Sequence, residues 1–147
     1  MISKKTKYAI KALVALASRK DKSPMTISDI ATQEKIPKKF LEAILLDMRR
    51  QGVLGSKIGI GGGYYLIMKP KDILLSSLLR NIDGPIALLP CVSLNFYERC
   101  ADCKDETTCG IRKTFIEVRD ATLKILSETT LEDILKKDKS HRSKKVL

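Results

Sequence analysis

Apolar residues recur every three to four positions through the first fifty residues, which is the spacing that places them on one face of a helix. The pattern predicts helices over residues 3–19, 27–34 and 38–51. The third helix has an apolar side formed by Phe40, Leu41, Ile44, Leu45 and Met48. Because the last two helices are short and joined through Ile36 and Pro37, they are typical of a helix-turn-helix.

The pattern then changes to two short apolar runs, residues 53–58 and 64–68, separated by the glycine-rich segment 59–63. Glycine tolerates positive φ, so the two runs can pair as a tightly turned hairpin. A helix-turn-helix followed by such a hairpin predicts a winged helix, although a hairpin that only completes the fold has the same pattern. A phosphate-binding loop is excluded because no Gly-Lys-Ser/Thr and no helix start follow the glycines.

Beyond the hairpin, a short helix is expected over residues 72–82 and a long one over residues 110–127. The long helix has an apolar stripe formed by Ile111, Phe115, Val118, Thr122 and Ile125. Such a stripe beyond a completed winged helix is expected to be buried against other apolar surface. A second copy of the chain is the simplest partner. Packing within one monomer is the alternative.

The resulting prediction is a mainly α fold with a small β-wing. It divides into a winged-helix DNA-binding domain (1–84), a cysteine loop (85–109), a dimerisation helix with a short final helix (110–137), and a basic disordered tail (138–147). His141, the single histidine, falls in this tail and is expected to be solvated rather than a metal ligand.

Composition and charge narrow the functional class. The 147 residues carry a net charge of +11, and residues 1–80 hold sixteen Lys and Arg against six Asp and Glu. A polyanion is the natural partner of such a surface, and double-stranded DNA fits the predicted motif. No signal sequence or apolar run of about 18 residues is found, so a cytoplasmic protein without membrane contact is expected.

The four cysteines lie close together in the sequence, at Cys91, Cys100, Cys103 and Cys109. In a reducing compartment, clustered cysteines are more often metal ligands or redox-active thiols than structural disulfides. Thiolates suit both iron–sulfur clusters and zinc. Zinc sites commonly use two C-x2-C pairs, and this chain has one, so the spacing favours an iron–sulfur cluster over zinc. A thiol/disulfide switch and inert cysteines remain open.

Four motifs occur in a fixed order along the chain. It opens with S-x-K-x-x-Y-A-I-x-A-L, continues with F-L-E in the third helix and G-x-G-G-G-Y-x-L in the hairpin, and has I-D-G-P before Cys91. Together these motifs resemble the IscR/NsrR-like (Rrf-type) family of winged-helix regulators. The resemblance covers residues 1–127. It implies a homodimeric bacterial transcription factor, usually a repressor, and the family includes sensors of iron–sulfur status, nitric oxide and redox state as well as cluster-free sensors of cysteine metabolism.

The resemblance also implies a ligand set. Cluster-binding members use three cysteines before the dimerisation helix, often with a histidine or carboxylate as the fourth ligand. Here the position three after the last cysteine is Arg112, and the first helix offers Tyr8, so all four cysteines are the predicted ligands. Family frequency favours [2Fe–2S] over [4Fe–4S]. An arginine common in the family's wing is replaced by Ile58, which leaves Lys57 as the nearby cation.

The DNA contacts expected from the motifs divide between phosphates and bases. Basic residues of the first helix and wing would hold phosphates, and the start of the third helix would read bases in an imperfect palindrome. The full predicted set is Ser3, Lys4, Lys5, Lys7, Tyr8, Thr26, Ser28, Pro37, Lys38, Lys39, Glu42, Arg49, Lys57, Gly61 and Gly62. The state of the cysteine site would change the geometry between two DNA-reading heads, and hence DNA affinity.

An enzyme is not expected. The sequence shows no nucleophile–base pair, no cofactor loop and no small-molecule substrate site, and the cysteines alone do not define a reaction. A zinc-stabilised DNA-binding protein without a sensing role is the further alternative.

Overall fold

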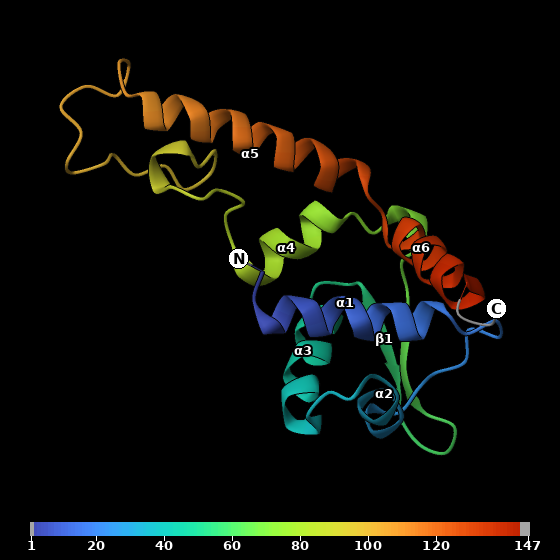
Figure 1. Cartoon of the computed structure of the whole chain (residues 1–147). Coiled ribbons are helices and arrows are strands. Elements are labelled where there is room, and N and C mark those ends of the chain that lie inside the picture. Colours follow the sequence, from blue (N-terminus) through green and yellow to red (C-terminus); the bar gives the residue numbers. More distant parts are fainter. Residues whose placement is uncertain (1, 145–147) are drawn as a thin grey trace. The chain divides into compact units, whose positions relative to one another are not determined.

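The computed structural model describes the backbone of residues 2–144 and the side chains of residues 2–139. The chain divides into two compact units (Figure 1). The N-terminal unit contains the described residues up to Ile73 and those from Thr130 onward, and the cysteine unit is Leu74–Thr129. Among the described residues, no helix has both the length and the apolarity needed to cross a bilayer.

Three helices form most of the N-terminal unit: α1 (Lys4–Ala17), α2 (Ile27–Glu34) and α3 (Lys38–Arg50). The first two begin at hydroxyl caps. Ser3 Oγ accepts a hydrogen bond from the Thr6 amide, and Thr26 Oγ1 accepts one from the Asp29 amide, each satisfying a donor that the helix leaves unpaired. The predicted helix-turn-helix is therefore present, with helix boundaries within two residues of those expected.

The three helices pack around one apolar core. Its largest side chains, each less than 2% exposed, include Leu13, Ile30, Leu41, Ile44, Leu45, Met48 and Leu54. They come from all three helices and the first strand, which agrees with the apolar periodicity of the sequence.

A two-stranded antiparallel hairpin completes this core. Strand β1 (Leu54–Lys57) pairs with β2 (Gly63–Leu66), so that Leu54 lies opposite Leu66. A further bridge joins Met25, just before α2, to Tyr64. The turn end of β2 is thus fixed to the segment that precedes α2, and the predicted mainly α fold with a small β-wing is confirmed.

Helix α6 (Leu131–Lys144) returns to the N-terminal unit and packs on α1 and on the short 3-10 turn Pro70–Asp72. Its buried side chains are Leu131 and Leu135. The sequence predicted a helix ending at residue 137, but the backbone of residues 138–144 continues α6 in place of the expected disordered tail. This segment lacks Pro and Gly and is rich in Lys, a good helix former. Residues 145–147 and the side chain of His141 lie outside the described set.

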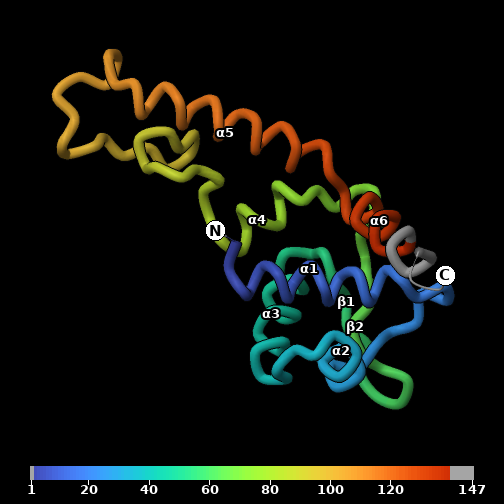
Figure 2. The backbone as a smooth tube through the Cα atoms, in the orientation of Figure 1, coloured from blue at the N-terminus to red at the C-terminus, as the bar shows by residue number. Residues whose placement is uncertain are grey.

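The cysteine unit contains α4 (Leu75–Asp83), the 3-10 turn Pro90–Val92 and α5 (Gly110–Glu128). Both shorter elements pack on α5. Figure 2 follows the long connection from α4 to the start of α5, which contains all four cysteines. The Arg119 guanidinium donates a 2.6 Å hydrogen bond to the Val92 carbonyl oxygen and so ties this connection to the middle of α5.

Candidate DNA-binding surface and cysteine centre

The start of α3 presents a compact set of polar side chains. Lys38, Lys39 and Glu42 are all exposed, and Pro37 occupies the N-cap position without a side-chain hydrogen bond to the helix. Amides at such an open helix start are available to an anion. The structure therefore brings the predicted base-contacting residues together. Arg49 lies in the last turn of α3, at the opposite end from this set.

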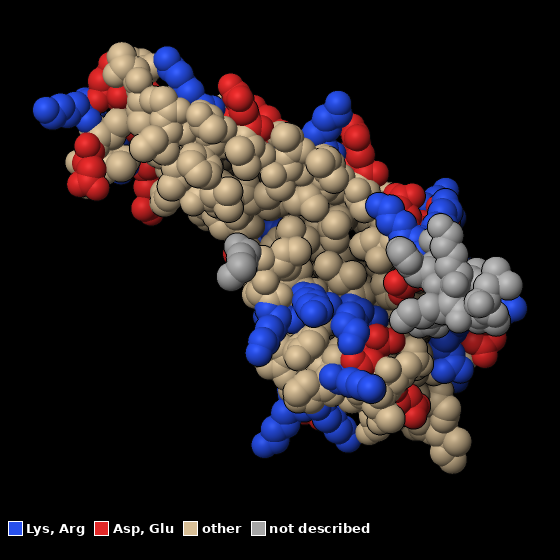
Figure 3. Space-filling view, viewed as in Figure 1, with Lys and Arg blue, Asp and Glu red and all other residues tan. Residues whose placement is uncertain are grey.

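The basic residues of α1 have two different roles. Lys4 and Lys7 are exposed, whereas Lys5 forms a 2.7 Å ion pair with Asp47 of α3. A hydrogen bond and charge attraction from Lys5 lower the pKa of the Asp47 carboxyl. Figure 3 shows Lys and Arg side chains gathered over the α1–α3 part of the N-terminal unit. The surface is thus basic as predicted from the sequence, but Lys5 also holds α1 to α3.

Tyr8 also joins these two helices. Its ring meets Phe40 edge to face, with centroids 5.6 Å apart and an interplanar angle of 84°. Phe40 was expected on the buried side of its helix, yet it is 42% exposed because it lies against Tyr8 rather than within the core. Of the remaining predicted contacts, Ser3 and Thr26 serve as helix caps, and Ser28 is exposed in the first turn of α2.

The tip of the hairpin has a defined turn. The Gly62 amide donates a 3.0 Å hydrogen bond to the Gly59 carbonyl oxygen. Gly61 has a φ of 69°, which glycine adopts more readily than other residues. A Cβ on Gly62 would collide with the Lys57 carbonyl oxygen. Gly61 and Gly62, predicted as DNA contacts, are therefore also needed for the shape of the turn.

All four cysteines line one cavity of about 370 Å³ in the cysteine unit. Cys91 is buried, Cys103 and Cys109 are half-buried, Cys100 is exposed, and all are free thiols. The remaining lining residues are Leu89, Pro90, Glu98, Arg99, Glu106, Ile111 and Arg112. The structure thus gathers residues that are up to eighteen positions apart, as expected of a shared ligand set.

The thiols share this cavity without converging on one point. Within the described part of the chain, no three His, Cys, Asp or Glu side chains already form a group able to hold a metal ion. Partial burial, followed by the neighbouring Cys109 and Cys100 thiols, raises the pKa of Cys103. A metal would reverse this effect by binding the thiolate directly. The four sulfur donors are of the type that iron–sulfur clusters take.

Arg112 organises the two ends of the cysteine segment. Cys109 is the N-cap of α5, and its Sγ accepts a hydrogen bond from the Arg112 amide at 3.4 Å. The Arg112 Nε donates to the Cys91 carbonyl oxygen at 3.2 Å. One residue therefore positions both Cys91 and Cys109. Sequence reasoning considered Arg112 only as a missing ligand; its place three residues after a cysteine cap was the available signal.

A second hydrogen bond closes the exposed part of the loop. Tyr97 Oη donates to Glu106 Oε1 at 2.6 Å, and this bond is the main cause of the raised pKa of Tyr97. The segment between these two residues contains Cys100 and Cys103. This contact, which sequence reasoning missed because the two residues are nine positions apart in irregular structure, limits how far the segment opens.

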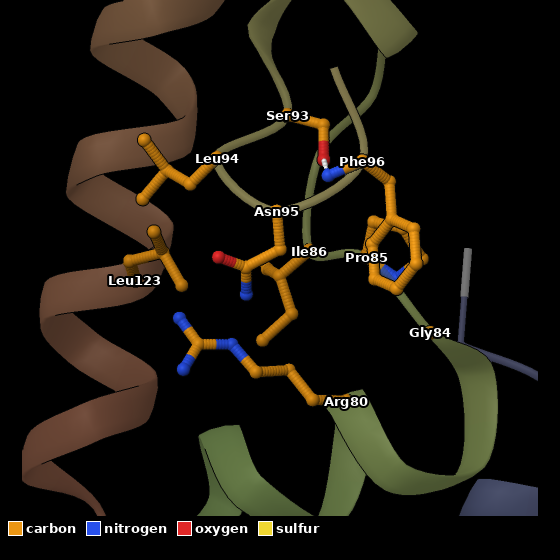
Figure 4. Close-up of a pocket in the computed structure, with 9 residues that line it drawn as sticks. All are labelled: Arg80, Gly84, Pro85, Ile86, Ser93, Leu94, Asn95, Phe96 and Leu123. Atoms are coloured by element: carbon orange, nitrogen blue, oxygen red, sulfur yellow. Dashed lines mark hydrogen bonds between the residues drawn. The ribbon is translucent and has the colours of Figure 1, made fainter.

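A smaller cavity lies beside α4 and α5 in the same unit (Figure 4). Arg80 and Leu123 face it from the two helices, and the Ser93 hydroxyl accepts a 3.1 Å hydrogen bond from the Phe96 amide. Its volume of about 60 Å³ is far below the several hundred Å³ typical of small-molecule sites. This cavity therefore does not support a metabolite-binding role.

Helix α5 has no buried residue along its nineteen positions. Within the predicted stripe, Ile111 and Ile125 are each about two-thirds exposed (66% and 65%), and Val118 is 39% exposed. Phe115 is half-buried, and Thr122 is exposed. Ile111, Val118 and Ile125 are spaced seven residues apart, so they lie along one line of the helix.

Comparison with known proteins agrees with this architecture. Residues 2–137 match the Rrf2 family, which is described as an iron-dependent transcriptional regulator. An rrf2-like HTH-type transcriptional regulator of Rhodobacter capsulatus is 52% identical over 139 residues, covering 92% of each chain. The HTH-type transcriptional regulator IscR of Vibrio atlanticus is 26% identical over 135 residues, covering 92% of this chain and 75% of the relative.

A solved structure supports the same assignment. CymR, the global cysteine regulator of B. subtilis, superposes with a TM-score of 0.77 at 29% identity, covering 92% of this chain and 96% of that one. The family match spans both units, and the relatives are named as transcriptional regulators. The chain therefore belongs to the Rrf2 family of helix-turn-helix transcriptional regulators, which bind DNA and are not enzymes.

Proposed function

We propose that this chain is a homodimeric transcriptional repressor whose affinity for DNA is set by an iron–sulfur cluster held by its four cysteines. The observation that carries the proposal is that Cys91, Cys100, Cys103 and Cys109 line one largely apolar cavity at the start of α5. The iron dependence in the family description and the similarity to IscR support a cluster. When bound, such a cluster supplies a redox-sensitive, thiolate-anchored centre.

The start of α5 explains how the chain would respond to the state of its thiols. Cys109 caps the helix, and its Sγ accepts a hydrogen bond from the Arg112 amide, so any change in the bonding of this sulfur acts directly on the start of α5. Arg112 also holds the Cys91 backbone. Engagement or release of Cys109 thus alters the cap of α5, and Arg112 transmits the change to the Cys91 turn.

The apolar line on α5 supports the proposed homodimer. Ile111, Val118 and Ile125 remain exposed in the single chain, and burying them in a second copy removes apolar surface from water. A dimer then presents two α3 helices to successive major grooves, so the operator is an imperfect palindrome. Lys38 or Lys39 reaches guanine, Glu42 accepts from cytosine, and Lys4, Lys7 and Lys57 hold phosphates.

The test compares cysteine variants with a matched serine substitution in the same loop. Cys100→Ser, Cys103→Ser and Cys109→Ser are each expected to remove the visible absorption of anaerobically purified protein and to change DNA affinity to that of the cluster-free form. Ala101→Ser, which introduces the same side chain at an exposed loop position, should leave both unchanged. Equal DNA affinity of wild type with and without its cluster would contradict the proposed control.

Cys91→Ser tests the fourth ligand separately. Cys91 is buried and held through its carbonyl oxygen, so serine can keep the fold while removing the thiol. Loss of the cluster identifies Cys91 as a ligand. Retention of a normal spectrum and iron content shows that three cysteines suffice and that the four-cysteine ligand set is wrong.

The alternative is a regulator without an iron–sulfur cluster: zinc-stabilised, cluster-free, or switched by a thiol/disulfide pair. The similarity to a global cysteine regulator favours this candidate. A colourless anaerobic protein with one zinc per chain would support the zinc form. A metal-free protein whose DNA affinity changes with a thiol reductant would support the disulfide switch.

A further inference from the structure

The hairpin tip carries two unusually exposed isoleucines. Ile58 is 97% exposed and Ile60 is 104% exposed, relative to a fully accessible reference. No other large apolar side chain among the described residues is more than about two-thirds exposed. Lys57, immediately before Ile58, is an exposed cation. The outermost part of the wing is therefore apolar with a positive charge at its base.

This apolar tip is held in a fixed shape. Ile60 is the second residue of the hydrogen-bonded turn from Gly59 to Gly62, and Gly61, the third residue, has the positive φ that a type II turn requires. Just below the turn, the Tyr64 backbone of β2 exchanges hydrogen bonds of 2.9 and 2.8 Å with the Met25 backbone. Because the turn and the strand end that carries it are both held by hydrogen bonds, the isoleucines are presented without a large loss of loop freedom on binding.

The tip also lies at the DNA-facing end of its unit. Figures 1 and 2 show that the turn between β1 and β2 and the start of α3 project toward the same end of the N-terminal unit. The start of α3 carries exposed Lys38 and Lys39. A helix in the major groove with a narrow hairpin beside it places the hairpin at the adjacent minor groove. Continuity with this basic surface identifies DNA, rather than another protein, as the occupant.

We propose that Ile58 and Ile60 insert into the minor groove as an apolar wedge that partly unstacks a base step and kinks the duplex. This role rests on the proposed DNA binding. It adds a contact through which the protein would favour DNA sequences that are easily deformed. Apolar wedges of this kind bend DNA by about 20–90° toward the major groove. Pyrimidine–purine steps, above all TA, unstack most easily, so the wing selects them without hydrogen bonds to bases.

The experiment uses the full-length protein and a duplex selected by the wild type from a random 30-base-pair library. Binding is followed by fluorescence anisotropy, and bending by energy transfer between dyes at the two duplex ends. The test variant is Ile58→Ser with Ile60→Ser. Ile67→Ser, which alters a 60% exposed isoleucine just beyond β2, is the matched control. Circular dichroism checks that each variant is folded.

The double variant is expected to bind the duplex about tenfold more weakly, which is the scale of one lost base-pair contact. It should also lose most of the DNA bend. Its salt dependence should stay the same because no phosphate contact is lost. Ile67→Ser should match the wild type. By contrast, Lys57→Gln should lower the salt slope by about one and keep the bend.

Two results would overturn the wedge. If the folded double variant binds and bends the duplex like the wild type, the two isoleucines do not act as a wedge. A double variant that keeps its DNA affinity but sediments as a smaller species shows that the tip contacts protein instead. If the wild type selects no duplex at all, DNA binding itself fails, and that outcome is distinguishable from failure of the wedge alone.

Discussion

The two units of this chain differ in how fully each buries its own apolar residues. In the N-terminal unit, Leu13, Leu41 and Leu45 are completely buried, and helices and hairpin share one core. In the cysteine unit, the longest helix of the chain has no buried residue, and Ile111 and Ile125 are mostly exposed. The first unit has the features of a closed fold. The second leaves apolar surface exposed, and we propose that a second copy of the chain covers it.

A core truncation in the N-terminal unit should have the largest effect. Leu45→Ala removes three carbon atoms from a fully buried site and is expected to lower the free energy of unfolding by about 2–5 kcal/mol. Urea denaturation followed by circular dichroism measures this loss. A change below about 1 kcal/mol would show that the unit is less closed than its burial indicates.

The corresponding change in the cysteine unit should act on association rather than on folding. Ile125→Glu places a charge in the proposed dimer contact twice, once from each copy, so the dimer dissociation constant should rise about a hundredfold. Sedimentation equilibrium measures it. Lys124→Gln, at the neighbouring exposed position, changes the net charge by the same single unit and is the control. Equal dissociation constants for both variants would mean that the apolar line on α5 is covered in another way.

The same contrast explains what the sequence could and could not predict. Helices α2 and α3 were located to within a residue because their apolar faces, the Thr26 cap of α2 and the flanking Pro37 and Gly52 all act locally. The continuation of α6 to Lys144 was missed because a Lys-rich segment has no apolar face beyond Leu135 to reveal it. Its return to α1 depends on tertiary packing, which periodicity does not encode.

The cysteine site was predictable in composition and not in geometry. Spacing identified the four thiols as a set, and the structure places them around one cavity. The Arg112–Cys91 hydrogen bond joins residues twenty-one positions apart through irregular structure, so no local pattern revealed it. Likewise, Lys5 matched a DNA-binding motif, whereas its ion pair with Asp47 forty-two positions away emerged only from the fold.

Removing the Arg112 contact tests whether the cysteine unit is organised before metal binding. Arg112→Ala should weaken the metal centre about tenfold, which is typical for residues that orient ligands, and should shorten the lifetime of the visible absorption in air. A second measurement uses metal-free protein in which the other three cysteines are changed to serine. In this background, Arg112→Ala should speed modification of the buried Cys91 by a maleimide. Lys113→Ala is the control. Unchanged reactivity of Cys91 would show that Arg112 does not hold this turn.

The ion pair between α1 and α3 should give the smallest effect, because both side chains are more than one-third exposed. Such pairs contribute about 0.2–1 kcal/mol. The lowered pKa of Asp47 means that its contribution is present above about pH 4 and is lost as the pH falls through that lowered pKa. A double-mutant cycle of Lys5→Gln and Asp47→Asn separates the free energy of this ion pair from the effects of other carboxylates. The coupling free energy from urea denaturation should be measurable at pH 7 and should decrease as the pH is lowered through the pKa of Asp47. A coupling that does not decrease as the pH falls would show that α1 and α3 are joined at this point by contacts other than charge.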